Sequence, residues 1–459
     1  MRSPILQTVL FWTLTAFLVL AWFGGGPTVD GTATDEWLMV FALIPLLLSA
    51  TLLLFYVPPS GWMRCAIVLA LLVPLVPLLQ LVSVPEGFWH LSTYRTGVTA
   101  DLDAAGVSAG QHAWSLWPEA TARALFSLLP ALACFLGALA LGHERAHRLV
   151  PIALGLVLAN LVFGLFQVGL PPESGMRLYT DNGTGIGGVL MNGNHQGTAL
   201  IVGMLLSLGL CARERRMGND LGHSHGIKST AYATAALACL AAVALTGSSA
   251  AMVIALVAFA CAVFATGLLS VGRIRRSRRG KASGVAVLAV LVLGLISAQG
   301  WMNLEKTDAL RYQLARETAE LGLRHAPMGS GAGTFVDAYA QSASLLFQRG
   351  EYINHAHNEF AQWWFEAGWP GLALILAVLA LLVTCGWHLL WGKQRDPVAV
   401  ACWVAVLAVL AHSWVDFPLR TLSQMSMTAL LAGIVVSAAA THGPRTTPAE
   451  AASPAIEQA

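Results

Sequence analysis

Long apolar runs dominate this sequence and restrict the chain to a narrow set of folds. A helix that crosses a bilayer needs about 20 consecutive, mostly apolar residues, and about twelve runs of this chain satisfy that rule. Of its 459 residues, 56% are hydrophobic and only 11% are charged. A soluble domain carries about 25% charged residues. The sequence therefore predicts an all-α integral membrane protein.

The predicted spans occupy most of the chain up to residue 440. In chain order they are 5–23, 37–56, 63–84, 122–141, 149–168, 197–212, 229–246, 250–271, 284–300, 369–390, 397–415 and 422–441. The first run has no small-x-small cleavage signal after it, so we interpret it as a retained helix rather than a signal peptide. We expect residues 1–440 to form a single polytopic membrane domain, and the Ala/Pro/Thr/Glu-rich tail 441–459 to be disordered in the cytoplasm.

Lysine and arginine in the short loops predict the orientation of the spans. These residues follow the fourth, sixth, eighth and tenth spans, so the even-numbered exits and both termini should be cytoplasmic. The densest group follows the eighth span and comprises Arg273, Arg275, Arg276, Arg278, Arg279 and Lys281. Contact with anionic lipid headgroups explains such a group better than binding of nucleic acid does.

Three long segments then face outward. They are 85–121, 169–196 and 301–368. The last is the largest, and its apolar residues Leu310, Leu314 and Leu321 follow helical spacing over 305–325. We expect part of this segment to be a helix that lies over the outer face.

The run from His355 to Gly371, HAHNEFAQWWFEAGWPG, is the most unusual stretch of the outward segments. It begins in a polar segment and continues into a membrane helix, so its ionisable residues should lie where water meets the bilayer. Ionisable side chains at that depth are costly and usually functional. An interfacial belt explains its tryptophans, but not two histidines, an asparagine and a glutamate within five positions.

Cations in the outward segments are candidates for binding an anion. Guanidinium groups pair with phosphate oxygens in bidentate fashion, so arginines converging on one face suit a diphosphate. The candidates are Arg177, Arg311, Arg316, Arg349 and Arg420, with Arg324 as a solvated loop charge. Gly329 to Phe335 forms a glycine-rich turn whose backbone N–H groups could also approach a phosphate.

A metal site is not expected at His355 and His357. Residues two apart lie on opposite sides of a strand and far apart around a helix, which is poor spacing for a chelate. No cysteine is near them in the sequence. We predict no metal ligand among the site residues and no cofactor.

Four motifs together resemble those of the O-antigen ligase family and its polymerase relatives. The residues that carry the resemblance are, in chain order, Asn192-Gly193-Asn194-His195, Gly329 to Phe335, His357-Asn358 followed after nine residues by Gly368-Trp369-Pro370-Gly371, and His412-Ser413-x-x-Asp416-Phe417-Pro418-Leu419-Arg420. They occur in the family's order over the C-terminal two thirds of the chain. Gly193 stands where the family usually has proline, and Ser249 stands where many members have arginine.

The resemblance implies a GT-C-like glycosyltransferase of the bacterial inner membrane, with about twelve helices, a large periplasmic loop and an active site that faces the periplasm. Such enzymes transfer a glycan from undecaprenyl diphosphate to lipid A–core, to another carrier-linked glycan or to a protein hydroxyl, without a metal ion. His357 matches the family's essential histidine. Arg177 and Arg311 most resemble its diphosphate-binding arginines. Asn194, His195 and Asn358 are the remaining predicted substrate-binding residues.

The residues leave other functions open. The leading interpretation is an O-antigen ligase, and a polysaccharide polymerase or a protein O-oligosaccharyltransferase of the same family is the alternative. A transporter or flippase has a similar number of spans, but such proteins place ionisable residues and broken helices near the middle of the membrane. A structural scaffold explains the hydrophobicity but not the grouped histidines and arginines.

Overall fold

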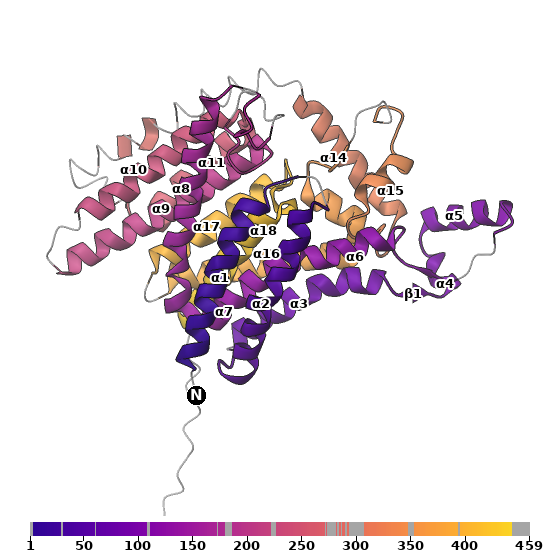
Figure 1. Cartoon of the computed structure of the whole chain (residues 1–459), viewed down its shortest axis with the longest axis horizontal. Helices are drawn as coiled ribbons and strands as arrows, with labels where there is room; N and C mark the ends of the chain where they lie inside the picture. Colours follow the sequence, from indigo (N-terminus) through magenta and orange to yellow (C-terminus); the bar gives the residue numbers. More distant parts are fainter. Residues whose placement is uncertain are drawn as a thin grey trace, which may run out of the picture.

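The protein is a helical bundle capped at one end by a small helical layer, as seen in the computed structural model (Figure 1). The structure describes residues 3–28, 31–59, 61–107, 111–171, 173–179, 186–221, 226–270, 307–347, 353–392 and 395–442, with isolated positions between 272 and 292. The predicted tail and most of the predicted span 284–300 therefore lie outside the described residues.

The N-terminal half contains eight α-helices and one short β-ladder. The helices are α1 Pro4–Gly24, α2 Ala33–Phe55, α3 Gly61–Gln80, α4 Glu86–Trp89, α5 Thr93–Ala104, α6 Pro118–Ser127, α7 Leu129–Ala146 and α8 Leu149–Val168. Strands β1 Ser83–Val84 and β2 His112–Ala113 pair antiparallel, with Ser83 opposite Ala113.

The C-terminal half contains the elements that form the centre of the bundle and its cap. They are α9 Gly193–Leu221, α10 Gly226–Val243, the 3₁₀ turn η1 Ala244–Thr246, α11 Ser249–Ala265, α14 Thr307–Arg324, α15 Phe335–Ser342, α16 Glu359–Trp391, α17 Pro397–His412, the 3₁₀ turn η2 Pro418–Arg420 and α18 Leu422–His442.

Among the described residues, nine helices are long and apolar enough to cross a membrane, and α11 and α17 are shorter apolar helices. The prediction of about twelve spans is thus met only in part, because the ninth predicted span cannot be assessed. The eighth and eleventh spans also end earlier than expected, at Ala265 and His412. The helix predicted over 305–325 is α14.

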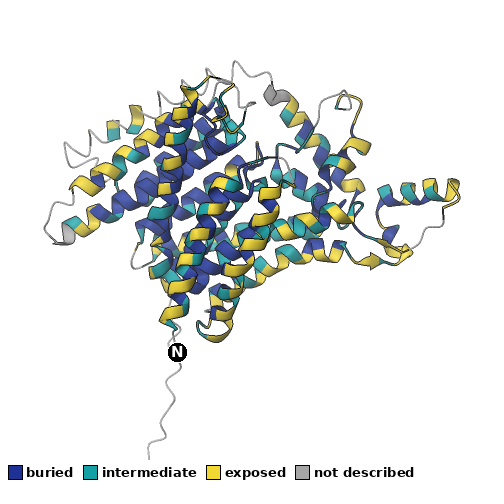
Figure 2. Ribbon diagram, viewed as in Figure 1, coloured by how far each residue is buried: buried dark blue, intermediate teal, exposed yellow. Residues whose placement is uncertain are grey.

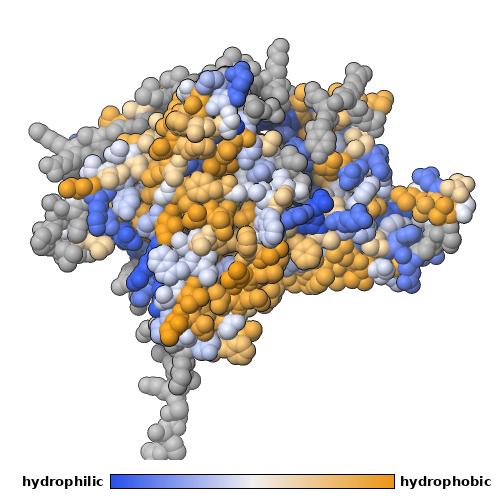
Figure 3. Space-filling view, in the orientation of Figure 1, coloured by the Kyte–Doolittle hydropathy of each residue, from blue (hydrophilic) through white to orange (hydrophobic). Residues whose placement is uncertain are grey.

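The surface of the bundle is apolar where lipid would contact it. Large apolar side chains of α1 to α3 are exposed, such as Leu54 (76%), and hydrophobic atoms cover much of that face in Figure 3. Within a bilayer, helices satisfy their own backbone hydrogen bonds, which is why apolar runs of this length fold as helices there.

Helix α9 is the central element of the bundle. Its spanning segment is buried along its whole length, and it packs against α8, α10, α11 and α17 (Figure 2). The sequence predicted only a short span, 197–212, at this place. The helix is longer because polar residues at both of its ends continue the same helical backbone.

The described part of segment 301–368, which the sequence predicts to face outward, has a core of its own. Leu314 and Leu321 of α14 pack with Phe335 and Tyr339 of α15 and with Phe365 of α16. Helix α16 joins this cap to the bundle. It begins at Glu359 in the cap, passes a kink at Gly368 and continues to Trp391 in the bundle.

Contacts among the cationic turns place the even-numbered exits at one end of the bundle. The Arg145 guanidinium, after the fourth predicted span, donates to the Pro4 carbonyl near the N-terminus. The Arg216 guanidinium, after the sixth predicted span, donates to the carbonyl of Thr266, which directly follows α11, and to that of Arg395, which follows the tenth predicted span. This arrangement agrees with the alternation predicted from the loop charges.

Candidate active site

Three histidines from two segments surround the ring of Phe417. Phe417 lies in the turn between α17 and α18, His195 lies in the first turn of α9, and His355 and His357 immediately precede α16. Their ring centroids lie 5.0, 4.2 and 5.0 Å from that of Phe417. Residues of three predicted family motifs therefore meet at one place.

Asp416 lies beside two of these histidines. Its Oδ1 is 3.7 Å from His357 Nδ1 and 3.8 Å from His195 Nε2, and the side chain is 1% exposed. Burial disfavours the charged form, but His195 and His357 outweigh it and hold the pKa of Asp416 well below its ordinary value. The site thus contains a buried carboxylate next to a partly exposed imidazole.

Glu359 clamps the start of α16 to the turn that carries Asp416. Its backbone N–H donates to the Ser413 carbonyl at 2.8 Å. Its Oε1 accepts from the Leu419 N–H at 2.7 Å and from the Ser413 hydroxyl at 3.3 Å. Glu359 is near His357 in the sequence, but its carboxylate is used in this clamp, and the carboxylate of Glu366 pairs with Arg420.

The glycine-rich turn supports α16 rather than presenting its N–H groups to a ligand. Ser330 and Gly331 donate to the carbonyls of Phe365 and Glu366 at 2.9 and 3.0 Å, and Ala332 donates to Gln80 Oε1. Gly329 has φ +79°, and a Cβ there would meet the Glu366 carbonyl. Its glycines are needed for this close approach of backbones.

A cavity of about 760 Å³ opens beside His357. We call it the His357 cavity; the residues that line it include Asn194, Ser249, Arg311, His357, Asn358 and Asp416. Among the described residues that line it, Asp416 is the one carboxylate. Apolar side chains, Ile254 and Trp414 among them, form the remainder of the wall, so the cavity combines a polar end with an apolar one.

Three helices begin at the His357 cavity. Asn194 is in the first turn of α9, Ser249 is the first residue of α11, and Asn358 is the N-cap of α16. The N-terminal end of a helix carries a partial positive charge and favours anions. Ser249 occupies the position where the resemblance leads one to expect arginine, so here the helix end supplies part of the positive potential.

The structure separates the predicted arginines. Arg311 lines the His357 cavity and, within the described part of the chain, has no hydrogen-bonded partner. Arg316 also lines it, but its exposed guanidinium donates to Glu320 at 2.9 Å. Arg177 is not part of the cavity wall, and its Nη2 donates to the Leu170 carbonyl at 2.8 Å. Arg349 lies outside the described residues.

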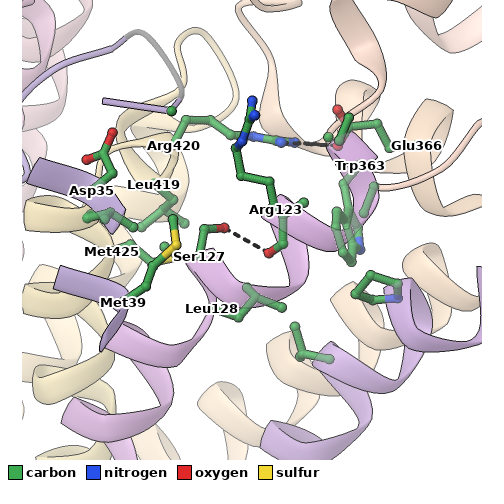
Figure 4. Close-up of a pocket in the computed structure, with 18 of the residues that line it drawn as sticks. Asp35, Met39, Arg123, Ser127, Leu128, Trp363, Glu366, Leu419, Arg420 and Met425 are labelled. Carbon is green, nitrogen blue, oxygen red and sulfur yellow. Dashed lines mark hydrogen bonds and ion pairs between the residues drawn. The ribbon is translucent and has the colours of Figure 1, made fainter. Parts of the chain in front are cut away.

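Arg420 belongs to a second cavity of about 270 Å³, which we call the Arg420 cavity. Both guanidinium Nη atoms donate to Glu366 Oε2 at 3.1 Å (Figure 4). Asp35 and Arg123 also line this cavity. Glu359 and Leu419 line the Arg420 cavity as well.

The buried histidines His195 and His412 make polar contacts to other residues of the bundle. The carbonyl of His195 accepts from Gln424 Nε2 at 2.7 Å, and Nδ1 of His412 lies 2.7 Å from the Thr198 hydroxyl. His355 is 4% exposed, and its Nδ1 lies 3.3 Å from Gln362 Nε2. Burial, together with repulsion from Arg420, His195 and His357, lowers the pKa of His355 to about 3. Of the histidines around Phe417, His357 is the one that reaches a cavity.

Comparison with known protein families bears on the assignment. Residues 234–376 match the family model described as O-antigen ligase. This match supports an assignment of the chain to the O-antigen ligase and polymerase family. No curated protein matches the chain. The matched residues include the glycine-rich turn and the run from His357 to Gly371, but they end before Asp416.

The carboxylate beside His357, Asp416, is a candidate site residue whose pairing with His357 the sequence does not predict. In the sequence, Asp416 stands out only as part of the motif from His412 to Arg420, between the last two predicted spans. His357 and Asp416 are far apart in the sequence, and no local periodicity joins them. The available signal was that both belong to motifs of the same family.

Proposed function

We propose that this protein transfers a glycan from undecaprenyl diphosphate to a sugar hydroxyl, with lipid A–core as the acceptor, at the periplasmic face of the inner membrane. The observation that carries the proposal is the convergence of His357, Arg311 and three helix N-termini on one cavity. A polar cavity with an apolar wall suits a charged diphosphate on a lipid chain.

His357 is the proposed general base. With Nδ1 on the side of Asp416, Nε2 is the nitrogen available to a substrate hydroxyl. The acceptor oxygen attacks the anomeric carbon, its proton moves to Nε2, and the bond from that carbon to the phosphate oxygen breaks. The electron pair of that bond leaves with the lipid diphosphate. Asp416 stabilises the imidazolium that forms.

Arg311 and the helix ends are proposed to stabilise the leaving group. Charge grows on the bridging phosphate oxygen as the anomeric bond breaks, and fixed positive groups act most strongly where charge develops. Arg311 has no carboxylate partner among the described residues, so its charge is available to a ligand. Arg316 is a weaker candidate because Glu320 already neutralises it.

Polymerisation of carrier-linked glycans and transfer to protein hydroxyls remain the alternatives within the family, because all three use the same bond chemistry. A transporter is less well supported. Within α16, the one departure from helical dihedrals is at Gly368, near the outer end, and the apolar segment 369–391 continues beyond it. The titratable residues around Phe417 also lie at the end of the bundle rather than at its middle.

The test uses purified full-length protein in liposomes with an undecaprenyl-diphosphate oligosaccharide and lipid A–core. We expect His357→Asn to lower the transfer rate by roughly 10²–10⁴-fold, the usual contribution of a general base. Asparagine tolerates the positive φ of this position, so the variant should keep the fold. Product is measured by gel and mass spectrometry.

Arg324→Ala is the matched control, because Arg324 is an exposed cation of the same cap and lines neither cavity beside His357. It should retain wild-type transfer. Near-normal transfer by His357→Asn would refute the general base. A wild-type protein that uses a second carrier-linked glycan, but not lipid A–core, would make it a polymerase.

A further inference from the structure

Two histidines and an aspartate meet at the end of the bundle opposite to His357. His143 lies in the last turn of α7, His147 is the C-cap of that helix, and Asp396 precedes α17. The Nε2 atoms of His143 and His147 are 3.3 and 3.1 Å from Asp396 Oδ2. One ligand atom from each residue lies within 4.8 Å of the others. All three side chains are only 12–21% exposed.

These separations match the geometry of a bound transition-metal ion. Zinc binds nitrogen and oxygen ligands at about 2.0–2.2 Å in a tetrahedron, so its ligand atoms lie roughly 3.3 Å from one another. Histidines four residues apart stand on the same face of a helical turn. Imidazole nitrogens with one carboxylate oxygen form a ligand set that suits zinc.

The local backbone explains why these atoms face one another. Gly142 has φ 72° and ψ 168°, which interrupts α7 and starts the turn that carries both histidines. Asp396 is the N-cap of α17, and its Oδ1 accepts from the N–H groups of Val398 and Ala399 at 2.9 and 3.3 Å. The cap therefore occupies one carboxylate oxygen and orients the other, Oδ2, toward the histidines.

We propose that His143, His147 and Asp396 bind one Zn²⁺-class ion, with solvent as a further ligand, and that this ion joins the α7–α8 turn to α17. Helix α17 has 16 residues, so it separates the ion from the Asp416 turn by about 24 Å. The ion is thus a structural element and takes no part in glycan transfer. The loop charges predict that this end of the bundle is cytoplasmic.

The experiment uses full-length protein purified in detergent without a polyhistidine tag, stripped with a chelator and titrated with Zn²⁺ alone. Bound metal is measured by mass spectrometry and thermal unfolding is followed in parallel. Wild-type protein should bind about one ion per chain and gain thermal stability. His147→Ala should lose this binding, with an affinity at least tenfold weaker.

Asp396→Asn separates metal binding from helix capping. Asparagine caps a helix about as well as aspartate, but its amide nitrogen cannot bind a metal ion. This variant should keep the unfolding temperature of the metal-free wild type and lose the stabilisation by Zn²⁺. Two control variants should bind as the wild type does. One is His90→Ala, at a partly exposed histidine paired with Glu86, and the other is a His223→Ala/His225→Ala variant, outside the described residues.

Two results would overturn the proposal. Wild-type protein that takes up no Zn²⁺ and gains no stability would leave His143, His147 and Asp396 as a hydrogen-bonded clamp. Uptake that survives both His147→Ala and Asp396→Asn but disappears in the His223/His225 variant would place the metal elsewhere.

Discussion

His357 is held in an uncommon backbone conformation. Its φ is +51°, and among the described residues it is the one non-glycine residue with positive φ. Asparagine, aspartate and histidine tolerate this region better than other residues with a Cβ, and β-branched residues tolerate it poorly. Asn358 then begins α16 by accepting from the Ala361 N–H at 3.0 Å. The backbone at this point turns the imidazole back toward Asp416 while the helix leaves in another direction.

His325 should make the stability of the cap depend on pH. It is fully buried between the rings of Tyr94 and Phe365. Burial, with repulsion from Arg95 and Arg324, lowers its pKa from 6.5 to about 3. Below pH 6.5 the unfolded chain takes up a proton that the folded chain does not. Stability should therefore be full above about pH 6.5 and fall as the pH drops toward 3.

The measurement compares unfolding temperatures at pH 7.5 and pH 5. From pH 6.5 to pH 5 we expect His325 to account for about 1–2 kcal/mol of lost stability. His325→Phe keeps the ring packing and should reduce the loss, whereas His90→Ala should not change it. Because His355 titrates over the same range, some loss will remain. An unchanged pH profile in His325→Phe would contradict this assignment.

At the scale of elements, α16 connects the cap to the membrane bundle through a break at Gly368. Gly368 has φ 57° and ψ −145°, a region that is essentially restricted to glycine. The Trp369 N–H donates to the Pro327 carbonyl at 2.9 Å. The Trp364 indole donates to the Ala319 carbonyl of α14 at 3.0 Å. The short outer part of α16 is thereby attached to the cap, while the part beyond Gly368 spans the apolar layer.

Gly368→Ala should disturb both parts of α16. A Cβ would lie 2.2 Å from the Pro327 carbonyl oxygen and 2.6 Å from the Gly329 nitrogen, both of them backbone atoms. We expect a loss of roughly 1–3 kcal/mol from backbone strain, with a further cost from the clash. Thermal unfolding in detergent measures it, and glycan transfer should fall because His357 moves.

The matched control for that substitution is Gly155→Ala. Gly155 is an exposed residue of α8, and a Cβ there would meet nothing within 4 Å. Alanine is favoured over glycine in a helix interior by about 1 kcal/mol, so this variant should be at least as stable as the wild type. Equal losses in the two variants would show that Gly368 has no special conformational role.

On the scale of the whole molecule, the two ends of the bundle differ in chemistry. One end carries the cationic turns with His143, His147 and Asp396, and the other carries the His357 cavity and the cap. The contacts among the cationic turns show that they share a side. Which compartment each end faces is a prediction from the positive-inside rule.

Cysteine labelling tests that prediction. Ala340 is exposed on α15 of the cap, and Ser277 is in the cationic segment outside the described residues. In a background without the exposed Cys65 and Cys261, Ala340→Cys should react with an impermeant reagent added to intact cells. Ser277→Cys should react only after the membrane is opened. The reverse pattern would also place the His357 cavity in the cytoplasm.

Sequence reasoning was most successful where a property is local. Apolar runs predicted the membrane helices, and helical spacing predicted α14, because the length and period of a hydrophobic stretch depend on neighbouring residues alone. It was least successful in predicting which residues from distant parts of the sequence lie close together. Arg177 and Arg311 were equally plausible partners of His357, yet only Arg311 reaches its cavity. Arg177 lies in the described stretch 173–179 between α8 and α9, which forms neither helix nor strand, so no periodicity predicts where its side chain lies.

The Glu359 clamp has a consequence for how lipid composition should act on this protein. A bilayer thicker or thinner than the apolar belt of a protein is accommodated largely by helix tilt, at fractions of a kcal/mol per Å. The hydrogen bonds from Glu359 join the segments that carry His357 and Asp416, so tilt of the spans moves both residues together. Bilayer thickness should therefore change how readily a lipid-borne substrate enters from the side of the bundle. It should leave the rate of the proposed glycan-transfer step almost constant.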